Sequence, residues 1–351
     1  MIERVAGYTH VGAVPASTQR STRALRSTRA FAPIARHLLL AVERGVAREP
    51  PEHATRAAAR ALCVCAYSQP TSARPLLSDS LSSAGRLRDA RDELVDDAAR
   101  IVEQAHRRLP PGAVVPQLPP RLILGTSCRL LACRLRGAAE PRLELDTWIA
   151  AYEQPLASRT WRMLAALPQP GRSPFLPPGD FHHVFAARRQ APAAADELLF
   201  RHAMAAAAGA YVGGRSWPER VWEAERALLQ YLEQHAALAS GSPIESRVHG
   251  SRAVRRFEAL SRAFTIFLLE GDRDPRRRSA RANGGVSDLA LQAIAAAVLE
   301  LAYRHVRGGG EIPLSALLAQ IVFISLAPFL GADAASDFLR GQAHAPLASA
   351  A

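Results

Sequence analysis

Apolar side chains recur every three to four residues along most of this chain, in blocks separated by stretches rich in proline and glycine. This spacing places them on one face of an α-helix and the polar side chains on the other. No convincing strand pattern remains between the blocks, so the sequence predicts an all-α fold. The predicted helices cover residues 28–47, 53–68, 86–108, 119–136, 142–153, 194–211, 218–236, 251–269, 287–306 and 313–329.

Two breaks interrupt the helical pattern. Residues 168–179 (PQPGRSPFLPPG) divide the chain nearly in half, and residues 271–285 combine charge, proline and glycine as a mobile loop does. A length of 351 residues suits two domains. The predicted parts are a flexible N-terminal segment 1–27, a first helical domain 28–166, a linker 167–193, a second helical domain 194–340 and a flexible tail 341–351.

The two predicted domains follow the same order of features. The run RLLACRLRG at 129–137 aligns with ELAYRHVRG at 300–308, and upstream Arg91 aligns with Arg256. Each half contains a helix, a break, a glycine, a long helix, a loop, a helix that ends in Arg-Gly and an apolar helix. A shared order of this kind predicts two copies of one helical domain.

The basic composition is weaker evidence for a nucleic-acid partner than the net charge of +12 suggests. All 44 basic residues are arginine and alanine is overused, which is typical of GC-rich coding bias. Local excesses at 20–29 and 273–281 lie in segments expected to be flexible. There they suit solvated tails or non-specific phosphate contact better than base recognition.

The cysteines, the N-terminus and one apolar segment bear on compartment. Cys63, Cys65, Cys128 and Cys133 lack zinc-site spacing, so we expect reduced thiols, no metal and no cofactor. The N-terminus lacks a signal-peptide core, which predicts a cytoplasmic protein. Residues 313–332 carry no charge over a length that could span a bilayer, but we interpret them as a helix buried in a bundle or interface and expect no membrane association.

Nothing in the sequence indicates catalysis. There is no GxSxG, no phosphate-binding glycine loop and no HExxH, and the carboxylates are scattered opposite arginines on predicted helix surfaces. We therefore predict that the protein is not an enzyme.

Several segments resemble the C-terminal ligand-binding and dimerisation domain of the TetR/AcrR family of bacterial transcriptional regulators. In the second half they are 216–238 (SWPERVWEAERALLQYLEQHAAL), 255–271 (RRFEALSRAFTIFLLEG) and 299–335, which ends in APFLGADAA. In the first half, 119–137 and 143–155 are similar. The resemblance implies two tandem TetR-like helical bundles and a regulator that senses a small apolar ligand.

The family's DNA-binding unit is the main departure from this resemblance. The sequence motif of its helix-turn-helix is absent, although 2–7 (IERVAG) and 180–190 (DFHHVFAARRQ) are candidate remnants. A capping helix is the alternative interpretation of 180–190. DNA binding by this chain is therefore left open, and the second hypothesis is a ligand-binding or protein-interaction module that does not contact DNA.

The resemblance also implies a ligand pocket in the second half. Tyr231 and His235 are four residues apart on one helix face, so both polar tips could enter one cavity. An alternative is that these residues are ordinary core. The implied pocket residues are Trp222, Tyr231, His235, Phe257, Phe264 and Phe267.

Apolar stripes on the later helices of each half predict an interface. If both halves keep the family's dimer surface, one chain can pair its own halves into a four-helix bundle, an intramolecular pseudo-dimer. The alternative is a homodimer formed through the C-terminal helices. The predicted interface residues are Leu124, Cys128, Leu131, Leu135, Trp148, Tyr152, Ile294, Val298, Leu301, His305, Ile321, Ile324 and Phe329.

Overall fold

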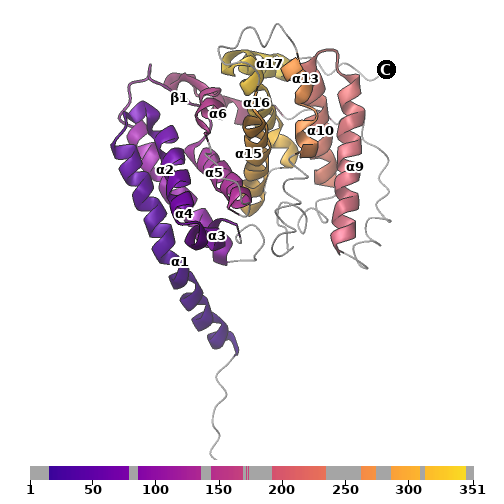
Figure 1. Cartoon of the computed structure of the whole chain (residues 1–351). Helices are drawn as coiled ribbons and strands as arrows, with labels where there is room; N and C mark the ends of the chain where they lie inside the picture. The colour runs from indigo at the N-terminus through magenta and orange to yellow at the C-terminus, as the bar shows by residue number, and fades with distance from the viewer. Residues whose placement is uncertain are drawn as a thin grey trace, which may run out of the picture.

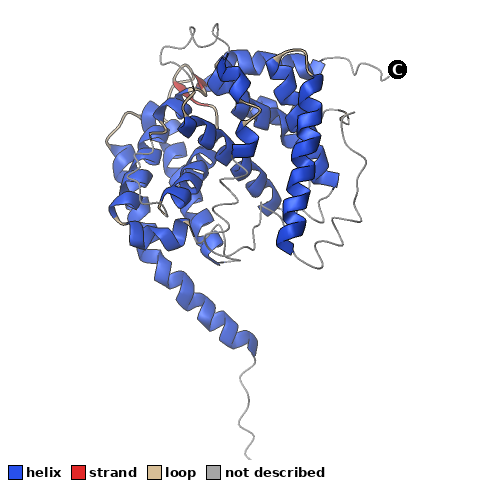
Figure 2. Ribbon diagram, turned by 45° about the vertical axis from the view of Figure 1, so that its right-hand side comes forward, coloured by secondary structure: helices blue, strands red, loops and turns tan. Residues whose placement is uncertain are grey.

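The protein is a helical bundle, seen here in a computed structural model that describes residues 16–78, 86–135, 144–168, 171, 173, 192–234, 262–273, 286–308 and 313–344. Helices make up most of the described chain (Figure 1, Figure 2). The prediction of an all-α fold is confirmed at this level. The expectation that the chain has no strands was wrong. Two short strands, β1 (Val114–Pro116) and β2 (Glu153–Pro155), pair antiparallel.

The first half is built around α5. Helix α1 (Ala16–Ala47) packs along α2 (Ala54–Ser68) and α4 (Arg86–His106), and α5 (Pro120–Arg134) lies against both α2 and α4. On α4 the buried side chains Leu94, Val95, Ala98, Ala99 and Val102 form one face, which makes the helix amphipathic. By contrast, α5 is buried over nearly its whole length from Leu122 to Ala132.

Short elements complete the first half. They are η1 (Pro51–His53), α3 (Pro70–Leu77), α6 (Asp146–Ala150), η3 (Leu156–Ser158) and α7 (Thr160–Ala165).

The second half is arranged around α16. Helices α9 (Pro192–Gly213) and α10 (Trp217–Gln234) pack side by side, and α10 lies against α16 (Leu318–Leu330). Helix α16 continues from η5 (Leu314–Leu317) and packs on α17 (Ala332–His344). The remaining helices are α13 (Leu269–Arg273) and α15 (Asp288–Arg307).

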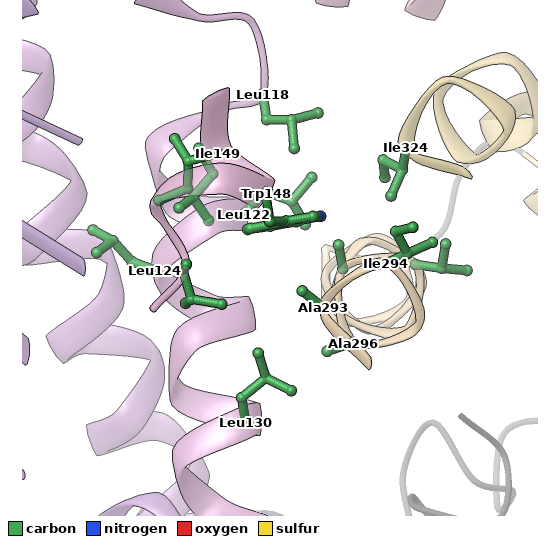
Figure 3. Close-up of a cluster of buried hydrophobic side chains, with 14 of the residues drawn as sticks. Leu118, Leu122, Leu124, Leu130, Trp148, Ile149, Ala293, Ile294, Ala296 and Ile324 are labelled. Carbon is green, nitrogen blue, oxygen red and sulfur yellow. The ribbon is translucent and has the colours of Figure 1, made fainter. Parts of the chain in front are cut away.

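The two halves share one hydrophobic core. A single cluster of buried residues runs from Ile34 in α1 to Leu339 in α17. Its centre is the contact of α5 with α15, where Leu122 and Trp148 of the first half face Ile294 and Ile324 of the second (Figure 3). The two halves therefore bury apolar surface against each other.

Several predicted helix boundaries differ from the structure. Helix α1 begins at Ala16 rather than at 28, inside the segment expected to be flexible. The helix predicted over 142–153 is only the short α6, because the chain turns after Ala150 and residues 153–155 pair with β1. The sequence pattern missed α3, α7 and α17. Most of the helix predicted over 251–269 lies outside the described residues.

The uncharged segment 313–332 forms η5 and α16 and is buried on nearly all sides by the rest of the protein. Within the described chain, α15 is the one helix long and apolar enough to cross a membrane by length and composition. Most of its residues are buried inside the bundle, as in the core helix of a folded domain.

All four cysteines are described and are free thiols. Cys63, Cys65 and Cys128 are buried and Cys133 is half-buried. Burial raises the pKa of the Cys128 thiol to about 11 and that of Cys63 still further. These side chains therefore serve as small apolar packing groups.

Candidate functional site

Buried charges gather where α4 and α5 meet α15. The carboxylate of Glu300 is completely buried and accepts hydrogen bonds from three arginines. Arg91 donates through both terminal nitrogens, at 3.0 and 2.8 Å, and Arg129 donates through Nε at 2.6 Å. Arg304, one turn along α15, donates through Nε at 2.9 Å. Two of these arginines come from the first half, so the charge cluster joins the two halves.

Gly125 makes room for this cluster, and the ring of Tyr303 faces two of its arginines. Gly125 leaves space on α5, since a Cβ built there would lie 2.4 Å from Oε1 of Glu300. The Gly125 carbonyl also accepts a hydrogen bond from Nη2 of Arg91 at 2.9 Å. On the other side, the Tyr303 ring faces the guanidinium groups of Arg91 and Arg129, which lie 5.7 and 5.1 Å from its centre.

The cluster keeps Glu300 ionised. Burial alone would raise the pKa of this carboxyl, but the positive charges of Arg91, Arg129 and Arg304 outweigh it and lower the pKa to about 2. The same carboxylate raises the pKa of Arg91 despite its burial. Every charge in the cluster is therefore present at neutral pH, and the loss of one leaves its partners buried without compensation.

A polar groove of about 520 Å³ opens beside the cluster. Its walls come from α4, the first turn of α5, α7 and the last turns of α15. An ion pair and a hydrogen bond tie the walls together: Arg304 donates to Asp96 at 2.8 Å, and the Tyr303 hydroxyl donates to Asp92 at 2.6 Å. Arg307 makes a further bond to Asp89. This groove therefore lies directly between the two halves.

Two contacts between the halves join residues with the same separation along the chain. Arg129 and Glu300 contact each other and are 171 residues apart, the same separation as the aligned runs 129–137 and 300–308. Tyr152 and Phe323 have that separation too, and their rings lie 5.8 Å apart. Arg134 near the end of α5 reaches Gln292 near the start of α15, so the helices are antiparallel. Arg129 and Glu300, which occupy aligned positions of these two runs, are thus in direct contact.

The structure brings most of the predicted interface residues into the shared core. Trp148 and Tyr152 pack edge to face, and Tyr152 also contacts Phe323 of α16. Leu135, Leu301 and His305 are half-buried near the ends of α5 and α15. The buried members are Leu124, Cys128, Leu131, Trp148, Tyr152, Ile294, Val298, Ile321, Ile324 and Phe329.

The predicted pocket residues are only partly described. Trp222 and Phe264 belong to the buried cluster, and Tyr231 is buried on α10. Phe267 is half-buried and packs on the ring of Tyr211 at 5.3 Å. None of these four lines the groove between α4 and α15. The other two, His235 and Phe257, lie outside the described residues.

A second buried carboxyl lies between α10 and α16. Glu225 accepts a hydrogen bond from the hydroxyl of Ser325, while its Oε2 has no partner within the described residues. Burial raises the pKa of Glu225 to about 8, with the Ser325 bond acting in the opposite direction. At neutral pH this side chain is therefore mostly a neutral acid.

Sequence patterns did not single out the charge cluster. Glu300 and Arg91 are 209 residues apart, so no local spacing connects them. The available signals were a glycine and an arginine in the apolar helix around 119–136, and a glutamate in the apolar run AAAVLELAY. A charge at the buried position of an apolar helix predicts a partner on another helix.

No family model, curated protein or solved structure matches the chain. Within the described residues, no three side chains of histidine, cysteine, aspartate or glutamate gather as metal ligands would.

Proposed function

We propose that this chain is a ligand-responsive transcriptional regulator of the TetR kind, in which the two halves take the place of two subunits. The observation that carries the proposal is the contact of Arg129 with Glu300 across the crossing of α5 and α15. In a closed twofold interface, residues on the axis meet their own equivalents. Aligned positions of two similar halves meet in the same way here.

The family resemblance supports the regulatory role. TetR-like regulators transmit ligand binding through the relative position of two paired domains. Here the halves are tied by buried charges and by the groove-wall pairs Arg304–Asp96 and Tyr303–Asp92. A ligand that changes the packing of one half therefore has a direct path to the other.

The alternative is a sensing or interaction module that does not contact DNA. It is favoured by the absence of the family's helix-turn-helix motif from the sequence. Such a module would act by associating with a complete regulator.

A mobility-shift assay separates the two proposals. The full chain is titrated into DNA from upstream of its own gene at physiological salt, with unrelated DNA of equal length as the control. Selective retardation of the upstream DNA supports the regulator. Equal retardation of both fragments, or none, supports the module.

Sedimentation tests the pseudo-dimer itself. We expect a mass near 37.8 kDa at low micromolar concentration, because the halves already occupy each other's interface. A mass of about twice that value would show that two chains pair instead. This measurement does not depend on DNA binding.

A further inference from the structure

The groove between α4, α5, α7 and α15 has the size of a small-molecule site. Its volume of about 520 Å³ falls within the usual range of ligand pockets. Both halves contribute to it, α15 from the second and the other helices from the first. It is separate from the pocket that the family resemblance implies near α10.

Two charged side chains in the groove have no partner within the described residues. The side chains of Glu103, half-buried on α4, and Arg121, exposed in the first turn of α5, form no hydrogen bond or ion pair there. The other charges of the lining are engaged, as in the Arg304–Asp96 pair. The groove thus offers one free carboxylate and one free guanidinium.

The start of α5 adds positive charge beside Arg121. The helix has 15 residues and begins at Pro120, and its amides at Leu122 and Ile123 donate to the carbonyl of Pro119. The helix dipole therefore adds partial positive charge next to Arg121. An anionic group is favoured at this end.

Part of the groove lining is apolar and aromatic. The lining includes the half-buried ring of Trp161 on α7, together with Leu122 and Leu301 from the two crossing helices. Burial of an apolar group against them is favourable by about 25 cal/mol per Å². The groove can therefore hold an apolar body together with charged groups.

The charges of the lining balance, and this selects the type of ligand. Three carboxylates face three arginines, so the lining has no net charge. A ligand of single charge would engage only one of Glu103 and Arg121. A ligand with both charges engages both and keeps the groove neutral.

We infer that the groove binds a small zwitterion with an apolar body, of the amino-acid type. Its carboxylate pairs with Arg121 at the start of α5, and its ammonium group pairs with Glu103 on α4. The apolar body packs on Trp161 and Leu301. Because Leu301 belongs to the second half, the bound molecule bridges the two halves.

Calorimetric titration of the full chain with three compounds tests this site. L-phenylalanine carries both charges, phenethylamine lacks the carboxylate and 3-phenylpropanoate lacks the ammonium group. We expect L-phenylalanine to bind with at least about tenfold higher affinity than either analogue, since each charged contact contributes on the order of 1.4 kcal/mol.

Matched variants test which side chain pairs with each charged group of the ligand. Arg121→Gln should weaken L-phenylalanine and 3-phenylpropanoate about tenfold and leave phenethylamine unchanged, and Glu103→Gln should have the reverse selectivity. Arg162→Gln, an exposed α7 residue outside the groove lining, is the control and should change nothing. Melting temperatures confirm that each variant is folded.

Two results would overturn the inference. One is no measurable heat with any of the three compounds at millimolar concentration. The other is a loss in Arg121→Gln that is equal for all three compounds. Neither result affects the DNA-binding proposal, which rests on the mobility-shift assay.

Discussion

The hydroxyl of Tyr152 donates a 2.8 Å hydrogen bond to the backbone carbonyl of Ile324 in α16. In a regular helix that carbonyl would accept from the amide of residue 328, but Pro328 has no N–H. Tyr152 comes from the first half and is completely buried. A side chain of the first half thus supplies the hydrogen bond that this carbonyl of the second half lacks within its own helix.

Removing this hydroxyl should destabilise the protein. Tyr152→Phe leaves the buried carbonyl of Ile324 without a partner, at a cost of about 1–3 kcal/mol in the free energy of unfolding. Pro328→Ala supplies the missing amide. In that background Tyr152→Phe should cost much less, and chemical denaturation of all four proteins completes the double-mutant cycle. Equal costs in both backgrounds would contradict this account.

Glu300→Gln should be among the most damaging single changes. It keeps the shape of the side chain but leaves Arg91 and Arg129 buried without their counter-charge, which costs about 3–5 kcal/mol. Asp337→Asn is the matched control, since its pair with Arg340 is exposed on α17, and it should cost no more than about 0.5 kcal/mol. Urea unfolding at neutral pH compares them.

The Glu300 cluster should also show in acid unfolding. The pKa of this carboxyl is about 2 in the folded protein and has an ordinary value of 4.5. Its stabilising contribution is therefore complete above pH 4.5 and is lost as the pH falls toward 2. The wild-type protein should lose stability over that interval, and Glu300→Gln should lose less.

Glu225 should produce the opposite pH dependence. Its pKa is about 8 in the folded protein against an ordinary value of 4.5, so the folded state holds a proton that the unfolded chain releases. Stability from this group is complete below pH 4.5 and declines as the pH rises through 8, by up to about 1.4 kcal/mol per pH unit.

Glu225→Gln should remove this decline, which melting temperatures between pH 5 and 8 would measure. Glu233→Gln, on the same helix, should behave as the wild type. An unchanged pH profile in Glu225→Gln would show that the carboxyl is ionised in the folded protein.

Gly125→Ala should weaken the contact of α5 with α15. The added methyl group would lie 2.4 Å from Glu300 Oε1, so the carboxylate must move, at a cost of about 1–3 kcal/mol. Gly209→Ala on α9 is the control, because nothing lies within 4 Å of its Cβ position. That change should stabilise the helix by about 0.5–1 kcal/mol. Thermal unfolding should show a lower melting temperature for Gly125→Ala and a higher one for Gly209→Ala.

The sequence predicted the long helices well and the short elements poorly. Periodicity over many residues placed α4 and α15 to within two residues at each end. It failed at α6, where the pairing of Val114 with Pro155 ends the helix early. That pairing connects residues far apart in the chain, and local periodicity carries no information about it.

The candidate site was less predictable than the fold. Aligning the halves placed Arg129 opposite Glu300, but nothing in that alignment indicated that the two side chains touch. The direct bond depends on how α5 crosses α15, and on the space left by Gly125. The groove likewise needs the position of Trp161 relative to α15, which only tertiary structure provides.

The unlike charges at the crossing of α5 and α15 carry a consequence for assembly. In a true homodimer, an axial Arg129 would face a second Arg129, and an axial Glu300 a second Glu300, with like charges buried together. Within one chain the two positions are free to differ, and here they attract. In the proposed arrangement, each half therefore pairs poorly with the same half of a second chain and well with the other half of its own chain.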